Sequence, residues 1–254
     1  ATVNRLAELG YLVLTDKPVL RCREIRPAVL DGPLVLSSEQ QQVFDGLDAQ
    51  MHQENPGVAL LYGVTGSGKT AIYLKLINRC LEEGKSALLL VPEIALTPQL
   101  LGLLAAYFGE QVAVLHSSLA AGERYDQWKR VKSGDAKVVV GTRSAVFAPF
   151  KDLGLIIIDE EQEHTYKSES TPRFCAQDVA RFRSGYHKCL FLMASATPSV
   201  QTYMLAKKGF YSLYTLKNRY GNVTLPTVRT ANMKQEYLNG NTGIFSNVLI
   251  EEIS

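Results

Sequence analysis

The segment that most constrains this chain is residues 63–70, which read Gly-Val-Thr-Gly-Ser-Gly-Lys-Thr and fit the pattern GxxxxGK followed by Ser or Thr. An apolar run at residues 58–61 precedes it, and a helical spacing of apolar residues over 70–81 follows and stops at Gly84. Between a strand and a helix, such glycines let backbone N–H groups surround phosphates at the positive end of the helix. The sequence therefore predicts a nucleoside triphosphate site.

The residue types in this loop match what phosphate binding needs. Lys69 is expected to reach the β- and γ-phosphates, and Thr70 is expected to offer its hydroxyl to Mg²⁺. The other positions bring backbone N–H groups to the phosphates. The predicted ATP-binding residues of the loop are Gly63, Thr65, Gly66, Ser67, Gly68, Lys69 and Thr70.

A phosphate-binding loop needs acidic residues nearby to hold Mg²⁺ and to position water, and the sequence contains a candidate group. The apolar run at residues 155–158 ends in Asp159, Glu160 and Glu161. An Asp at the carboxyl end of a parallel strand is placed to bind the Mg²⁺ of a triphosphate, and the next Glu can polarise the attacking water. An acidic strand end alone is more often a solvated cap, but beside a phosphate loop it indicates catalysis. We therefore expect Lys69, Asp159 and Glu160 to be the catalytic residues.

Apolar runs and amphipathic stretches alternate along the middle of the chain. Unbroken runs of Val, Leu and Ile are typical of parallel strands that are buried on both faces. Such runs occupy residues 58–61, 87–91, 112–115, 138–140, 155–158 and 189–192, with helical patterns at 70–81, 100–108 and 123–131. The alternation predicts an α/β fold with a parallel sheet flanked by helices.

Residues 1–30 have a different pattern. A short helical pattern at residues 3–9 stops at Gly10, and apolar runs at 11–14 and 19–23 flank a Thr-Asp-Lys-Pro turn. A helix followed by a hairpin indicates the trailing part of a winged-helix domain and a linker, or equally a surface hairpin packed on the main domain. We expect the main domain at residues 31–215, followed at 216–254 by a connection and the start of a truncated further domain.

Charge, cysteine content and hydropathy narrow the class of protein. With 27 Lys and Arg against 25 Asp and Glu, the net charge is +2, so any contact with nucleic acid must be local. The four cysteines form no CxxC pair, which predicts reduced thiols in a cytoplasmic protein. The most apolar long window, residues 94–108, is too short to span a membrane. Because the chain begins with Ala1, we expect a piece of a longer protein.

Three motifs in order give the chain a resemblance to a known family. The acidic run at 159–161, Ser-Ala-Thr-Pro-Ser at 195–199 and Gly-Thr-Arg-Ser-Ala at 141–145 resemble the ordered motifs of superfamily 2 helicases. Three further segments, 63–74, 92–99 and 141–150, are similar to the PriA family of replication-restart DNA helicases. The resemblance implies that residues 31–215 are the first of two RecA-like lobes and that residues 216–254 begin the second.

The resemblance also implies further site residues. Gln40 would contact adenine, although a Gln near a helix cap is otherwise unremarkable. An aromatic-rich loop between residues 159 and 174 would link DNA binding to ATP hydrolysis. The implied DNA-binding residues are Thr97, Gln99, His116, Ser117, Thr142, Arg143, Tyr166 and Lys167. The plainer alternatives are an ordinary loop histidine at 116, an Arg143 paired with a nearby acid, and a Tyr166 that anchors its loop to the core.

The chain departs from the family pattern at Gln162, where the family has His. That side chain is expected to relay the nucleotide state to Ser195 and Thr197. Because Gln both donates and accepts hydrogen bonds, ATP binding should survive the change. The coupling between hydrolysis and movement on DNA is the function that the change puts in doubt.

For the intact protein, the resemblance implies an ATP-dependent DNA helicase that moves 3′ to 5′ and opens stalled forks for primosome assembly. The implied partners are single-stranded and forked DNA, primosome and helicase-loading proteins and single-stranded DNA-binding protein, with zinc only in the second lobe. A fragment with one lobe should bind ATP and hydrolyse it poorly. Two alternatives remain: a DEAD-box RNA helicase, against which Glu161 and Gln162 count, and a nucleotide- and fork-binding scaffold with weak motor activity.

Overall fold

A computed structural model of the chain describes residues 2–13, 21, 25–30, 32–220 and 228–253. The chain divides into two compact units, residues 1–220 and 221–254. The boundary between the two units, at residue 220, lies a few residues after residue 215, the predicted end of the main domain.

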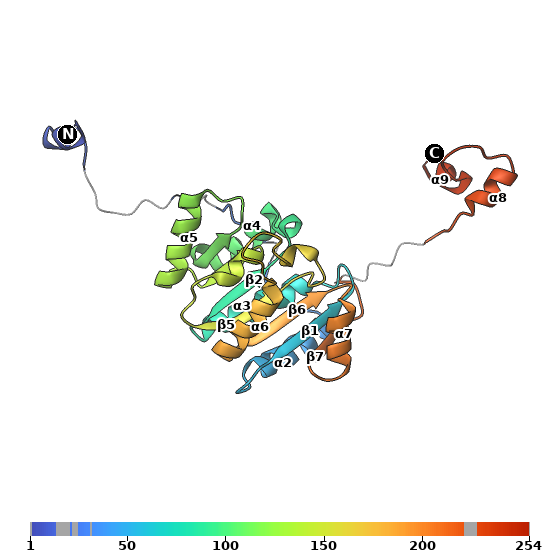
Figure 1. The fold of residues 1–254 in the computed structure, drawn as a ribbon, viewed down its shortest axis with the longest axis horizontal. Coiled ribbons are helices and arrows are strands. Elements are labelled where there is room, and N and C mark those ends of the chain that lie inside the picture. Colours follow the sequence, from blue (N-terminus) through green and yellow to red (C-terminus); the bar gives the residue numbers. More distant parts are fainter. Residues whose placement is uncertain (1, 14–20, 22–24, 31, 221–227, 254) are drawn as a thin grey trace. The chain divides into compact units, whose positions relative to one another are not determined.

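One parallel sheet of seven strands forms the centre of the first unit, in the order β3-β4-β2-β5-β6-β1-β7 (Figure 1). All six predicted strands are confirmed, and β7 is an addition. Only the last residue of β7 is buried, so this edge strand has no apolar run by which to recognise it. The strands are β1 (Val58–Gly63), β2 (Ser86–Leu90), β3 (Val112–Leu115), β4 (Val138–Gly141), β5 (Leu153–Ile158), β6 (Leu190–Ser195) and β7 (Ser212–Leu216).

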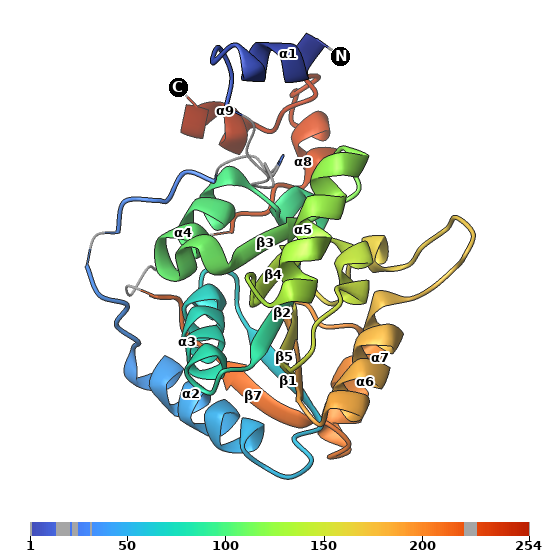
Figure 2. The same ribbon diagram turned by 90° about the vertical axis from the view of Figure 1, so that its left-hand side faces the viewer.

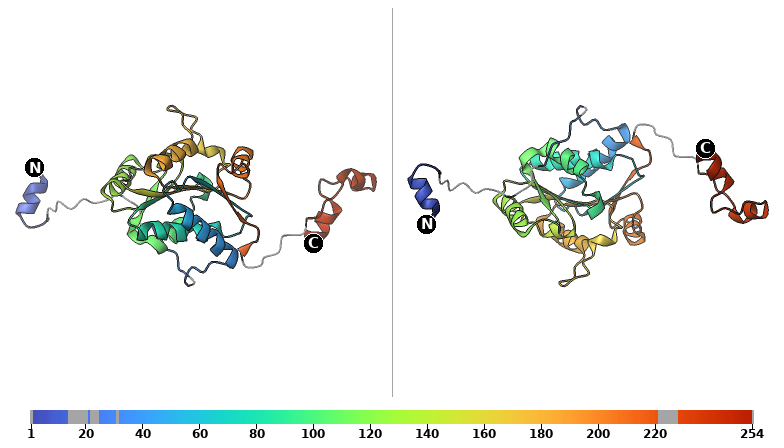
Figure 3. Two further views of the ribbon diagram at one scale, coloured as in Figure 1. Left: turned by 90° about the horizontal axis from the view of Figure 1, so that it is seen from below. Right: turned by 90° about the horizontal axis from the view of Figure 1, so that it is seen from above.

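Helices cover both faces of this sheet, as the edge-on views show (Figure 3). One apolar core lies between the sheet and the helices α2 (Ser38–Met51), α3 (Lys69–Glu82) and α4 (Pro98–Phe108). The other lies between the sheet and α5 (Ala121–Ser133), α6 (Ala176–His187) and α7 (Val200–Lys207), which Figure 2 shows around the strands. The three predicted helices correspond to α3, α4 and α5.

The register of the central strands determines which residues meet at the carboxyl edge of the sheet. Met193 of β6 pairs with Ile158 of β5 on one side and with Leu60 of β1 on the other. The residue after Ile158 is Asp159, and the phosphate loop follows the end of β1 at Gly63. Parallel pairing therefore brings the loop and the acidic residues to the same edge, with β6 between them.

Short elements complete the first unit. Among its described residues, four 3-10 helices lie in the connections, namely η1 (Glu93–Ala95), η2 (Gly109–Gln111), η3 (Arg143–Phe147) and η4 (His164–Tyr166). Near the N-terminus, α1 (Thr2–Glu8) ends where Gly10 adopts a φ of 75° and the Tyr11 N–H donates to the Leu6 carbonyl at 3.0 Å. This confirms the predicted helix, whereas most of the predicted hairpin at 11–23 lies outside the described residues.

The second unit contains α8 (Met233–Leu238) and α9 (Asn247–Ile253). The Glu236 carboxylate joins them by accepting hydrogen bonds from Asn241 and from the Asn247 N–H. The apolar pattern at the C-terminal end of the sequence corresponds to α9.

Three cysteines, Cys80, Cys175 and Cys189, are free thiols, whereas Cys22 lies outside the described residues. Burial raises the pKa of Cys80 and of Cys189 to about 12. In the ranges that the structure describes, no helix combines the length and the apolar character needed to cross a membrane.

Candidate active site

The phosphate loop lies between β1 and α3. Gly66 and Gly68 adopt left-handed φ values of 79° and 77°, which glycine tolerates best. A Cβ atom on Gly68 would lie 2.3 Å from Gln40 Nε2, so this position has no room for a side chain. Lys69 Nζ folds back over the loop and donates a hydrogen bond to the Gly63 carbonyl at 3.1 Å.

This loop fits a bound triphosphate. The Ser67 hydroxyl is buried and has no hydrogen-bond partner among the described residues, although buried hydroxyls are normally paired. Lys69 can exchange its carbonyl partner for phosphate oxygens, and Thr70 lies one position further into α3. No group of three or more His, Cys, Asp and Glu side chains suited to a metal occurs in the described ranges. Mg²⁺ in triphosphate sites is usually held by one or two side chains together with the phosphates, so Thr70 and Asp159 are the side chains that would hold it.

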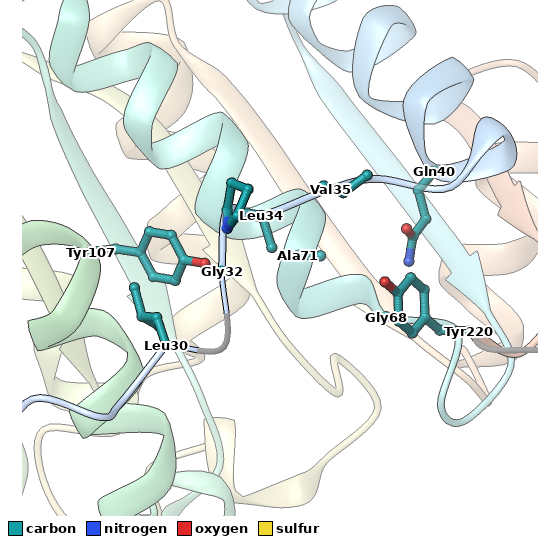
Figure 4. A pocket seen from close by; sticks show the side chains of 10 residues that line it. Leu30, Gly32, Leu34, Val35, Gln40, Gly68, Ala71, Tyr107 and Tyr220 are labelled. Carbon is teal, nitrogen blue, oxygen red and sulfur yellow. The ribbon is translucent and has the colours of Figure 1, made fainter.

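A cavity of about 280 Å³ opens beside the loop. Leu30, Leu34 and Tyr107 line one part of it, and Gln40, Gly68 and Tyr220 line the other (Figure 4). A mostly apolar recess next to the phosphate loop has the character expected for a purine base.

Gln40 is buried, with 2% of its surface exposed. Its side-chain amide makes two hydrogen bonds within the protein. Its Oε1 accepts from the Ser37 N–H at 2.8 Å, and its Nε2 donates to the Ser67 carbonyl at 2.9 Å. Its Nε2 carries a second hydrogen that can donate one more hydrogen bond. Gln40 thus holds the phosphate loop itself, and contact with adenine remains a prediction.

The acidic residues lie close to the loop. The Tyr73 hydroxyl, on α3, donates a hydrogen bond to Asp159 Oδ1 at 2.8 Å. Burial raises the pKa of Asp159, while the bond from Tyr73 and the charge of Lys69 partly offset this rise. Glu160 has a φ of 46°, a left-handed conformation that is strained for a side chain with a Cβ. Strain of this kind clusters at functional sites, which supports a role for Glu160.

A chain of hydrogen bonds runs from Glu160 to the end of β6. Gln162 Nε2 donates to Glu160 Oε2 at 3.0 Å, and the Ser195 hydroxyl donates to Gln162 Oε1 at 2.6 Å. The Thr197 N–H donates to the Ser195 hydroxyl at 2.8 Å. The structure therefore brings together the three residues predicted to couple nucleotide state to movement, with Gln162 in the middle.

Glu161 forms a second link between the same two segments, which the sequence does not predict. Its carboxylate is buried and accepts from the Ser199 N–H at 2.6 Å, from the Ser199 hydroxyl at 3.4 Å and from the Thr202 hydroxyl at 3.1 Å. These donors lie at the start of α7, where a negative charge is favourable. Glu161 thus fixes α7 to the acidic segment.

The predicted DNA-binding residues lie in the connections that follow four strands, β2, β3, β4 and β5. Gln99 and Ser117 are exposed, and Ser117 donates to Glu93 at 3.1 Å. Thr97 caps α4 by accepting from the Leu100 N–H, and His116 is half-buried. These positions share the carboxyl edge of the sheet with the phosphate loop.

Two of the predicted DNA contacts, Tyr166 and Thr142, are buried in this conformation. Tyr166 is 1% exposed, and its hydroxyl donates to the carbonyls of Asp159 and Leu90 at 2.6 and 3.2 Å. Its ring therefore anchors the loop to the core and cannot stack on a base. The Thr142 side chain is also buried, so it cannot reach a phosphate.

Arg143, at the start of η3, contacts the loop that carries Lys167. Arg143 Nη1 donates to the carbonyls of Thr165 and Lys167 at 3.2 and 3.1 Å rather than to an acid. Lys167 is exposed, and Phe174 packs edge-on against Phe147 with ring centroids 4.9 Å apart. Of the two predicted contacts in this loop, Tyr166 and Lys167, Lys167 is the exposed side chain.

Comparisons with known proteins agree with this site. Residues 37–205 match the family described as DEAD/DEAH box helicase. The replication restart protein PriA of Bacillus subtilis (strain 168) is 46% identical over 254 residues, which are 100% of this chain and 32% of that protein. The PriA of Synechocystis sp. is 37% identical over 256 residues, 98% of this chain and 30% of that protein. The chain thus spans about a third of the length of these relatives.

A solved structure supports the fold. The structure of RecG bound to a three-way DNA junction superposes with a TM-score of 0.56 at 24% identity, covering 81% of this chain and 27% of that one. The family match covers more than half of the chain, including the phosphate loop, the acidic residues and the segment after β6. The chain therefore belongs to the DEAD/DEAH box helicase family, whose members use ATP, and it is similar over its full length to replication restart proteins PriA.

Proposed function

We propose that this chain is the ATP-binding lobe of a replication-restart DNA helicase. The observation that carries the proposal is the bond from Tyr73 on the phosphate-loop helix to Asp159, which joins the two halves of a triphosphate site. The similarity to PriA extends over the whole of this chain, and it supports DNA rather than RNA as the nucleic acid on which the protein moves.

In this proposal each residue has a defined task. Lys69, Ser67 and the loop glycines hold the phosphates, Thr70 and Asp159 hold Mg²⁺, and Glu160 orients the attacking water. Bound Mg²⁺ supplies charge neutralisation at the transferred phosphoryl group. Gln40 and the neighbouring cavity take the adenine. Thr97, Gln99, His116, Ser117, Arg143 and Lys167 contact the DNA backbone along the carboxyl edge of the sheet.

For the intact protein, we propose 3′-to-5′ movement on single-stranded DNA that opens forks for primosome assembly. The partners would be forked DNA, helicase-loading proteins and single-stranded DNA-binding protein. A RecA-like motor hydrolyses ATP between two lobes, so one lobe alone should turn over slowly.

The decisive experiment measures ATP turnover by the full-length protein with and without forked DNA, for wild type, Lys69→Ala and the exposed control Lys208→Ala. We expect strong DNA stimulation in wild type and control, and a loss of about 100-fold or more in Lys69→Ala. Equal rates for wild type and Lys69→Ala would disprove the assigned site. Unwinding of forks with 3′ or 5′ single-stranded tails tests the direction.

The alternative is a nucleotide- and fork-binding scaffold with weak motor activity. It is favoured by Gln162, which lies in the relay between Glu160 and Ser195 where the family has His. A scaffold would bind ATP and forks but show no stimulation of turnover by DNA.

A further inference from the structure

The segment after β7, residues 217–220, runs along the phosphate loop. At one end, the Val64 N–H donates to the Leu216 carbonyl at 3.3 Å. At the other, the Tyr220 N–H donates to the Gly66 carbonyl at 2.9 Å. We call residues 217–220 the loop strap, because the bonds of Leu216, which precedes it, and of Tyr220, its last residue, hold its two ends to the phosphate loop.

The loop strap is also bonded to the helix that carries Gln40. The Glu39 carboxylate accepts from the Lys217 N–H at 2.7 Å, from the Asn218 N–H at 3.3 Å and from Asn218 Nδ2 at 3.2 Å. The strap is therefore held to both elements of the expected nucleotide site, α2 and the phosphate loop. These bonds to the backbone of the strap place its side chains next to the expected nucleotide site.

Arg219 carries an unsatisfied donor beside the loop. Its Cδ lies 3.9 Å from where a Cβ of Gly66 would stand, and its Nε is buried with no acceptor among the described residues. Two other buried side-chain atoms in the described ranges lack a hydrogen bond, Asp48 Oδ1 and Ser67 Oγ. Asp48 is paired with Arg79 at 3.3 Å, whereas Ser67 belongs to the phosphate loop. The two unexplained atoms thus belong to the loop and to the strap bonded to it.

Tyr220 lies where the same loop borders the cavity. Its Cβ is 3.7 Å from where a Cβ of Gly68 would stand, and it lines the cavity together with Gln40. Figure 4 shows its ring beside the Gln40 amide. An aromatic ring at the edge of an apolar recess suits a flat heterocycle.

We propose that Arg219 and Tyr220 are nucleotide-binding residues: the guanidinium binds the phosphates and the ring packs against the base. This inference rests on the proposed ATP site and adds to it a contact from outside the phosphate loop. The guanidinium is the side chain best suited to phosphate, because its planar donors bind two oxygens at once. The order along the strap, Arg219 at Gly66 and Tyr220 at Gly68, matches the order of phosphate and base along a nucleotide.

The test measures equilibrium binding of ADP and of inorganic pyrophosphate, which lacks the base, to the full-length protein by competition with a fluorescent nucleotide. Arg219→Gln should weaken both ligands by about tenfold or more. Tyr220→Leu should weaken ADP and leave pyrophosphate unchanged. Lys217→Ala, whose side chain is exposed while its N–H keeps the bond to Glu39, is the control and should bind as wild type.

The outcomes separate this inference from the proposed function. If Lys69→Ala loses binding while Arg219→Gln and Tyr220→Leu bind both ligands like wild type, the inference is overturned and the ATP site stands. If wild type binds no nucleotide, both are overturned. If Arg219→Gln and Tyr220→Leu weaken ADP and pyrophosphate to the same extent, the strap is only structural and the inference is also overturned.

Discussion

The Tyr73 hydroxyl donates a hydrogen bond to Asp159 Oδ1 at 2.8 Å, and this bond joins the phosphate-loop helix to the end of β5. It has two effects on the carboxylate. It fixes the direction in which Asp159 points, and it partly offsets the rise that burial causes in the pKa of Asp159.

The first prediction concerns this bond. Tyr73→Phe keeps the buried ring and removes only the hydroxyl, so the fold should persist. Residues that orient a metal ligand typically contribute 10- to 100-fold to affinity or activity. We expect DNA-stimulated ATP turnover to fall by about tenfold and to require more Mg²⁺. The acid limb of its pH profile should move to higher pH, because the pKa of Asp159 loses a contact that lowers it. An unchanged Mg²⁺ requirement would contradict this role.

The second prediction concerns the cost of burying Asp159. Because folding raises the pKa of this carboxyl, its charged form opposes folding at neutral pH. Asp159→Asn keeps an acceptor for Tyr73 and removes the charge, so the Tm of the 254-residue chain at pH 7 should rise. The gain should shrink as the pH falls through the pKa of Asp159, where the wild-type carboxyl takes up its proton. Asp152→Asn, at an exposed position, is the control. Hydrolysis should be lost while stability rises.

Much of this site follows from sequence because parallel strands end at one edge. The pattern of apolar runs predicts the strands, and parallel pairing then places Lys69 near Asp159 without any further information. The relay through Gln162 needed the family resemblance, because nothing in the composition of the segment distinguishes Gln162 from an ordinary polar residue.

Other contacts depend on details that the sequence pattern does not contain. Burial of Tyr166 could not be predicted, since an aromatic beside lysine suits both a core anchor and a stacking surface. The loop strap follows an edge strand without an apolar run, so neither β7 nor Arg219 is indicated. The sequence does not distinguish Glu161 from the two acidic residues before it, because its role depends on the position of α7.

The third prediction concerns Glu161. Glu161→Ala leaves the Ser199 and Thr202 donors without their acceptor at a buried position, which should cost about 2–4 kcal/mol. Urea unfolding of the 254-residue chain measures this. Glu161→Gln should lose less, because one oxygen remains. The matched control is Glu169→Ala, since Glu169 is exposed on the same connection. Equal stability of Glu161→Ala and wild type would show that α7 does not depend on this carboxylate.

The fourth prediction concerns Gln162. A His at this position can donate to Glu160 and accept from Ser195 through its two ring nitrogens, so Gln162→His in the full-length protein should have at least equal DNA-stimulated turnover. Gln162→Leu can do neither. It should bind ATP normally but lose most of the stimulation by DNA, as measured by turnover at saturating ATP with increasing single-stranded DNA. Stimulation of Gln162→Leu equal to wild type would show that the relay does not carry the coupling.

The fifth prediction separates two neighbours in the loop between β5 and α6. Tyr166→Phe loses the buried hydroxyl whose single proton is shared between two carbonyls, and should destabilise the chain by about 1–2 kcal/mol. Single-stranded DNA binding should stay unchanged because the ring is covered. Lys167→Ala should leave the stability of the chain unchanged and weaken its binding to single-stranded DNA. Its exposed cation would contribute about one phosphate contact, so the salt dependence of DNA binding should become shallower by about one unit of slope. Binding titrations at several salt concentrations compare the two. A Tyr166→Phe variant that loses DNA affinity at unchanged stability would show that the ring leaves the core when DNA binds.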